Sequence, residues 1–74
     1  MAIRTVEFTD INGNRVIINP AFVSGITEGN SLIHFNVSGE LIQETIKVTR
    51  IDTYHRIIEV DKDIDKVRDY IWGV

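Results

Sequence analysis

Hydrophobic and polar residues alternate near the start of the chain, in two short runs separated by a polar corner. Before the corner, Val6 and Phe8 alternate with threonine and glutamate, and a second apolar run follows the corner. A period of two is typical of a half-buried strand with one apolar and one polar face. We therefore expect strands over residues 3–10 and 15–19, joined as a β-hairpin.

The parity of the apolar residues restricts the register of this hairpin. The apolar side chains of both strands share a face only if the numbers of cross-strand partners sum to an even number. A three-residue loop over residues 12–14 meets this condition, with Asn14 in the left-handed conformation, and places Phe8 opposite Ile18. Pro20 cannot donate a ladder hydrogen bond and marks the end of the second strand.

The next part of the chain predicts a bend, a turn and a third strand. Residues 21–27 read as a short continuation of the sheet with a bend at Ser24-Gly25, and Glu28-Gly29-Asn30 has the composition of a turn. In the strand that follows, alternate residues form an apolar face: Ile33, Phe35 and Val37.

A fourth strand is expected over residues 41–50, after a turn at Ser38-Gly39. Its inward positions are apolar: Ile42, Ile46 and Val48. For the apolar residues of the third and fourth strands to share a face, the loop between the strands must contain two or four residues.

Residues 52–72 fit two different structures. The apolar residues from Ile57 to Ile71 are spaced by three and four, as in one long helix whose apolar stripe forms a coiled-coil seam. Like charges four residues apart oppose this helix, each pair by about 0.2–0.5 kcal/mol. These pairs are Glu59/Asp63, Asp61/Asp65, Lys62/Lys66 and Asp65/Asp69.

We therefore favour a fifth strand over residues 54–60, followed by a helix over residues 63–72 that Asp61 or Asp63 caps. Gly73 ends the helix. The helix residues expected to face the sheet are Ile64, Val67 and Ile71. The predicted fold is α+β, a small antiparallel sheet of four to five strands with one C-terminal helix, in a single domain over residues 1–74.

Composition limits both the core and the partners. The chain has 74 residues, of which 43% are hydrophobic, and such a chain buries roughly 60% of its unfolded surface. It contains no cysteine, so neither a disulfide nor a thiolate metal site is expected. Neither a membrane-spanning run nor a signal peptide is recognisable, so we expect a cytoplasmic protein without a membrane partner. The net charge of −3 argues against a general affinity for nucleic acid.

Candidate catalytic and metal-binding residues are few. His34 and His55 are far apart in the sequence and have no cysteine to complete a zinc site. Residues 61–65 resemble the start of a calcium-binding loop, but Lys66 and Trp72 stand where that loop needs glycine and glutamate. We expect helix capping there, and we expect no enzymatic activity, metal or cofactor.

Two stretches resemble a known family. The first contains Phe8-Thr9-Asp10-Ile11-Asn12-Gly13 and Ile18-Asn19-Pro20, followed by Val23 and Ile26. This pattern resembles the FlbD family of small flagellar proteins and related short bacterial and phage proteins, and residues 58–71 are similar to the family's terminal strand and helix. Residues 40–56 are longer than the family's single returning strand. The resemblance implies a small, non-enzymatic β-rich protein.

We expect a non-catalytic interaction or assembly module that forms homo-oligomers or binds another protein. The residues expected to bind the partner are apolar or aromatic: Tyr70, Ile71, Trp72 and Ile57. Two alternatives use a basic cluster that includes one aromatic residue, either to bind single-stranded nucleic acid or to bind a small anionic ligand such as a nucleotide at a subunit interface. That cluster is Lys47, Arg50, Tyr54 and Arg56.

Overall fold

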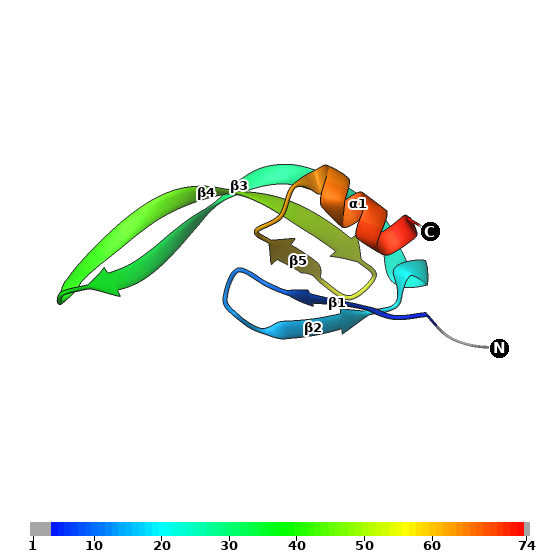
Figure 1. Ribbon diagram of the computed structural model, residues 1–74, viewed down its shortest axis with the longest axis horizontal. Helices are drawn as coiled ribbons and strands as arrows, with labels where there is room; N and C mark the ends of the chain where they lie inside the picture. Colours follow the sequence, from blue (N-terminus) through cyan, green and yellow to red (C-terminus); the bar gives the residue numbers. More distant parts are fainter. Residues whose placement is uncertain (1–3, 74) are drawn as a thin grey trace.

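The computed structural model describes residues 4–73, which form five strands and one α-helix (Figure 1). Residue 3, the expected start of the first strand, lies outside the described residues. The elements are β1 (Val6–Thr9), β2 (Arg15–Ile18), a 3₁₀ turn (Pro20–Phe22), β3 (Val23–Val37), β4 (Glu40–Thr53), β5 (Ile57–Val60) and α1 (Ile64–Trp72).

The strands form two sheets instead of the single sheet that we expected. Within residues 4–73, β1 and β2 pair only with each other, whereas β3, β4 and β5 form a second antiparallel sheet in that order. The hairpin packs its apolar face against the second sheet and joins it through one backbone hydrogen bond, from Ile11 N–H to Glu59 O at 3.0 Å. The mostly β architecture with one C-terminal helix is as predicted.

The parity predicted for the hairpin is confirmed, but the predicted register is wrong. Phe8 pairs with Val16, not with Ile18, and Ile18 pairs with Val6. The even sum of partner numbers places all four side chains on one face of the hairpin, and all four are buried.

The position of Gly13 explains the shift in register. The three-residue loop covers residues 11–13, so glycine and not Asn14 occupies the last place, with φ of 84°. Asp10 N–H donates to Asn14 O at 2.9 Å, and Gly13 N–H donates to Asp10 O at 3.0 Å. Glycine adopts positive φ without steric cost, so the loop forms one residue earlier than expected and the register moves by two.

β3 continues without a break through residues 28–30, where we predicted a turn. Gly29 pairs with Val48 inside the strand, and the guanidinium of Arg50 occupies the space where a Cβ at residue 29 would lie. Glycine therefore permits close packing at this position and does not mark a turn. The bend predicted at Ser24-Gly25 is confirmed as a bulge, because the pairing with β4 shifts there.

β3 and β4 are joined by the two-residue turn that parity allowed. Val37 pairs with Glu40, and both turn residues have positive φ, 52° for Ser38 and 84° for Gly39. This is the primed geometry that matches the right-handed twist of a hairpin. The cross-strand partners of β3 and β4 consequently sum to 77 along the regular part of the pairing, as in Phe35 with Ile42.

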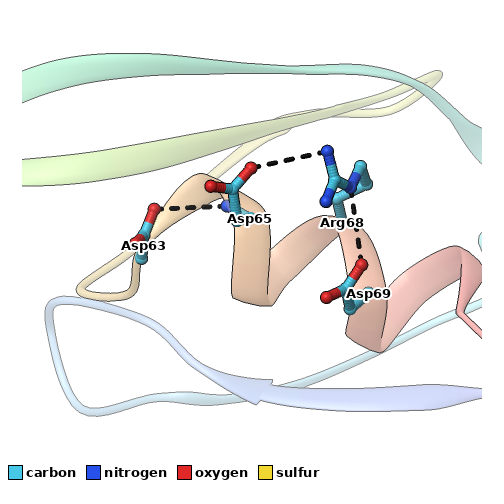
Figure 2. Close-up of polar contacts among 4 residues, drawn as sticks. All are labelled: Asp63, Asp65, Arg68 and Asp69. Atoms are coloured by element: carbon cyan, nitrogen blue, oxygen red, sulfur yellow. Dashed lines mark hydrogen bonds and ion pairs between the residues drawn. The ribbon is translucent and has the colours of Figure 1, made fainter.

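The core lies between the hairpin, the inner half of the β3-β4-β5 sheet and the helix. It comprises Val6, Phe8, Val16, Ile18, Ile51, Ile58, Val60, Val67 and Ile71. The single long helix is ruled out, since β5 and α1 are separate and both bury their apolar residues. Asp63 is the N-cap, and its carboxylate accepts the N–H of Asp65 at 3.2 Å (Figure 2). Ile64 is half-buried.

The molecule is elongated because β3 and β4 extend well beyond the core (Figure 1). Its principal extents are 51 × 22 × 20 Å, and its radius of gyration is 14.1 Å. A compact chain of this length has a radius of gyration of about 11 Å. The projecting part of β3 and β4 accounts for this difference.

Candidate functional site: the projecting ribbon

Residues 29–48 form a two-stranded ribbon that projects from the core. β5 pairs with β4 only from Thr49 to Asp52, so residues 40–48 of β4 have β3 as their sole strand neighbour among the described residues. None of the described residues in the main core cluster comes from the ribbon, although Val48 at its base is 1% exposed. A two-stranded hairpin without a third strand or a helix against it is only marginally stable in water.

One face of the ribbon is mostly apolar. Odd residues of β3 and even residues of β4 share this face, because directly paired residues project to the same side. Its apolar residues are Ile33, Phe35, Val37, Ile42 and Ile46, and Glu40 and Glu44 lie on it as well. Phe35, Val37 and Ile42 are 38%, 46% and 36% exposed. We predicted that Ile42, Ile46 and Val48 point inward. This is confirmed for Val48, which is 1% exposed, and wrong for Ile42, while Ile46 is half-buried.

The outer edge of β3 in the ribbon has free backbone groups. In a two-residue hairpin the pair beside the turn, here Val37 and Glu40, exchanges backbone hydrogen bonds, and the direction then alternates along the strand. The N–H and C=O groups of even-numbered residues in this part of β3 therefore point away from β4. One of these groups already has a partner, because Arg50 Nη2 donates to the carbonyl of Asn30 at 2.8 Å.

Beyond Asn30, where the guanidinium of Arg50 binds, this edge carries none of the devices that normally prevent strand pairing. Residues 29–37 contain no Lys, Arg, Asp, Glu or Pro, and their pairing with β4 is regular. Natural sheets protect exposed edges with charges, prolines, bulges or short strands. The opposite edge of the ribbon follows that rule, since residues 40–48 include Glu40, Glu44 and Lys47.

A groove lies beside the unprotected edge. It has a volume of about 430 Å³ and is lined by Ile11, Asn12, Leu32, Ile33 and His34. Successive side chains of a strand point to opposite faces, so three consecutive lining residues place the groove beside β3 and not over one of its faces. The tip of the β1–β2 hairpin forms its other wall.

The accessible surface of the chain is large for its size. It measures 5443 Å², whereas a folded monomer of 8.5 kDa typically exposes about 4,650 Å². The excess of about 800 Å² accompanies the elongated shape of the molecule.

The residues predicted to bind a partner lie elsewhere. Tyr70 and Trp72 on α1 are about half exposed, and the ring of Tyr70 meets the edge of the Phe8 ring at a centroid distance of 5.1 Å. Ile57 on β5 is 62% exposed. Ile71 is fully buried in the core, so its place in that prediction is wrong. The role of the other three stays a prediction.

The four residues of the predicted basic cluster are spread over the molecule. Lys47 and Arg50 project from opposite faces of β4 and each faces a glutamate: Lys47 Nζ lies 3.8 Å from a carboxylate oxygen of Glu28, and Arg50 Nε lies 3.1 Å from one of Glu59. Tyr54 and Arg56 are exposed in the β4–β5 turn, where the Tyr54 ring lies 6.1 Å from that of Phe22. The structure does not bring the four together.

The aspartates at the start of α1 and along it make contacts within the helix. Arg68 lies 3.4 Å from the carboxylates of both Asp65 and Asp69, while Asp63 caps the first turn (Figure 2). Among residues 4–73, no three His, Asp or Glu side chains come together as a metal site. His34 is exposed on the ribbon, and His55 lies beside Phe22. No helix in the described part of the chain is long and apolar enough to cross a membrane.

Sequence reasoning missed the ribbon because it assigned residues 28–30 to a turn. The signal was nevertheless present, since residues 29–37 lack charge and proline while their apolar residues alternate. A scan against protein-family models found no match for the chain, and searches of curated proteins and of solved structures found none either.

Proposed function

We propose that the protein is a non-catalytic assembly module that forms homo-oligomers through its ribbon. The observation that carries this proposal is a ribbon of two strands with an exposed, mostly apolar face. Within residues 4–73 it has no third strand beside it, and of its side chains only Val48 at the base is fully buried. Ordering such a ribbon costs conformational entropy that its own few contacts offset poorly. Contact with another molecule supplies the missing strand or surface.

The charge of the ribbon favours a protein partner over nucleic acid. Lys47 is its only lysine or arginine, and it lies near Glu28, while Glu40 and Glu44 are acidic. A nucleic-acid surface needs several cations to neutralise phosphates. The resemblance to the FlbD family agrees with a non-catalytic role and stays a prediction.

Sedimentation velocity over low to high micromolar concentrations tests this function. The full chain is expected to sediment as a species of at least twice the monomer mass, with a concentration-dependent distribution. A matched shortened chain lacks residues 31–36 and 41–46, which removes equal lengths of both strands and keeps the Ser38-Gly39 turn in register. It retains the main core and is expected to fold as a monomer. A full chain that stays monomeric throughout contradicts the proposal.

A further inference from the structure

We propose that two copies of the chain pair along the free edge of β3, antiparallel and about a two-fold axis, so that their ribbons form one four-stranded sheet. This inference rests on the proposed function and names its partner and its surface. The partner is a second copy, and the contact is made by the backbone groups of residues 30–36 that point away from β4. Edge pairing provides each ribbon with the third strand that it lacks.

The distribution of charge selects the β3 edge over the β4 edge. Residues 29–37 carry no formally charged side chain, so two such strands meet without like-charge repulsion. Pairing of β4 with its own copy instead brings Glu40 and Glu44 of one chain close to Glu40 and Glu44 of the other, which is unfavourable in cross-strand positions. The β3 edge is therefore the edge that can pair with its own copy without charge repulsion.

Side-chain parity and size select the register. In a two-fold antiparallel pair the partner numbers have a constant sum, and an even sum is needed to keep both apolar sets on one face. Residues 29–37 are centred on Ile33, which gives a sum of 66. Phe35 then faces Ser31 of the second copy, so that a large side chain meets a small one. Val37 faces Gly29, where the guanidinium of Arg50 lies beside it. Leu32 faces His34.

A groove lies beside the centre of this edge. The groove of about 430 Å³ follows Leu32, Ile33 and His34, the central residues of the proposed pairing. Neighbouring strands in a sheet lie about 4.8 Å apart, so the incoming strand occupies the groove directly next to β3. Arg50 donates to the carbonyl of Asn30, which still has a second lone pair for the incoming chain.

Two proline variants distinguish the edges. His34 and Gln43 are direct cross-strand partners, and the N–H of each points away from the other strand. His34→Pro removes a donor from the β3 edge, whereas Gln43→Pro removes the matched donor from the β4 edge. Proline at such outward positions leaves the internal ladder intact. In sedimentation velocity, His34→Pro is expected to be monomeric and Gln43→Pro to associate as the unmodified chain does, with unchanged helical circular dichroism for both.

Single cysteines test the register without proline, and the natural chain contains no cysteine to interfere. Ile33→Cys places the thiols of the two copies directly opposite each other, so an added oxidant is expected to give a disulfide-linked dimer. Val37→Cys separates them by eight residues along the strands, about 27 Å, and is expected not to cross-link at the same concentration.

The outcomes separate this inference from the proposed function. A monomeric unmodified chain overturns both. A chain that assembles but loses association with Gln43→Pro and not with His34→Pro overturns the β3 pairing and leaves assembly through the ribbon standing. Efficient cross-linking of Val37→Cys with none for Ile33→Cys overturns the two-fold antiparallel register.

Discussion

The guanidinium of Arg50 lies over Gly29, in the space that a Cβ at residue 29 would occupy. From there it donates to the carbonyl of Asn30 at 2.8 Å and lies 3.1 Å from the carboxylate of Glu59. One side chain thus ties together β3, β4 and β5 at the base of the ribbon. The missing side chain of Gly29 is what allows this arrangement.

Gly29→Ala is therefore expected to destabilise the fold only when Arg50 is present. Alanine suits a strand better than glycine by about 0.5 kcal/mol, but in this strand its Cβ displaces the guanidinium and weakens two hydrogen bonds, for a net loss of about 1 kcal/mol. In an Arg50→Ala background the same change is expected to stabilise by about 0.5 kcal/mol. Urea denaturation of the four variants at one protein concentration measures this coupling, and additive effects contradict the described packing.

Gly13 is expected to be sensitive to substitution because of its backbone conformation. Its φ of 84° in the hairpin loop is strained for any other residue, so Gly13→Ala is expected to lower the free energy of unfolding by about 1 kcal/mol. Gly25→Ala is the matched control, because Gly25 has negative φ and open space around its Cβ position. It is expected to change stability by less than about 0.5 kcal/mol. Equal effects of the two substitutions in thermal unfolding contradict the left-handed conformation of Gly13.

Ile71 is expected to act through the core. It is fully buried, so Ile71→Ala is expected to cost about 3 kcal/mol, and Ile71→Val about 1 kcal/mol if the alanine variant does not fold. Its neighbour Trp72 is 46% exposed, and Trp72→Ala is expected to cost about 1 kcal/mol or less. Chemical denaturation followed by circular dichroism compares them. A larger loss for Trp72→Ala contradicts the assignment of helix faces.

Thr49 is expected to fix the segment that leads into α1. It is 1% exposed, and its hydroxyl donates to the carbonyl of Lys62 at 2.7 Å. Thr49→Val keeps the shape but leaves that carbonyl without this donor, so a loss of about 1 kcal/mol is expected. Thr27→Val, on an exposed part of β3, is expected to be neutral within about 0.5 kcal/mol. Urea midpoints that do not differ between the two variants refute the role of the hydroxyl.

Local sequence patterns predicted much of the fold, because hydrophobic alternation and the charges of near neighbours determine which segments form strands and helices. Parity placed the hairpin's apolar residues on one face, and like charges four apart favoured a strand and a short helix over one long helix, as β5 and α1 confirm. Gly29 shows the limit of this reasoning. Glycine between Glu28 and Asn30 indicates a turn. The structure instead requires glycine at this position because the guanidinium of Arg50 occupies the space of a side chain. Arg50 is 21 residues away in the sequence and contacts Gly29 only after β3 and β4 pair.

The candidate site was harder to predict than the fold. Alternation showed that Phe35 and Ile42 share a face, yet no local pattern states whether the chain itself covers that face. The helix tail looked more exposed than it is, since Ile71 packs inward while Trp72 remains half exposed. Burial depends on contacts between distant elements, and these become visible only in three dimensions.

Hydrogen exchange of individual ribbon amides, measured by NMR at low and high protein concentration, tests the pairing of β3 edges most directly. The outward-pointing amides of Leu32, His34 and Asn36 are expected to become protected as concentration rises, while those of Leu41, Gln43 and Thr45 on the opposite edge exchange rapidly throughout. Rapid exchange of Leu32, His34 and Asn36 at every concentration, or protection of the β4 edge instead, contradicts the pairing of two β3 edges.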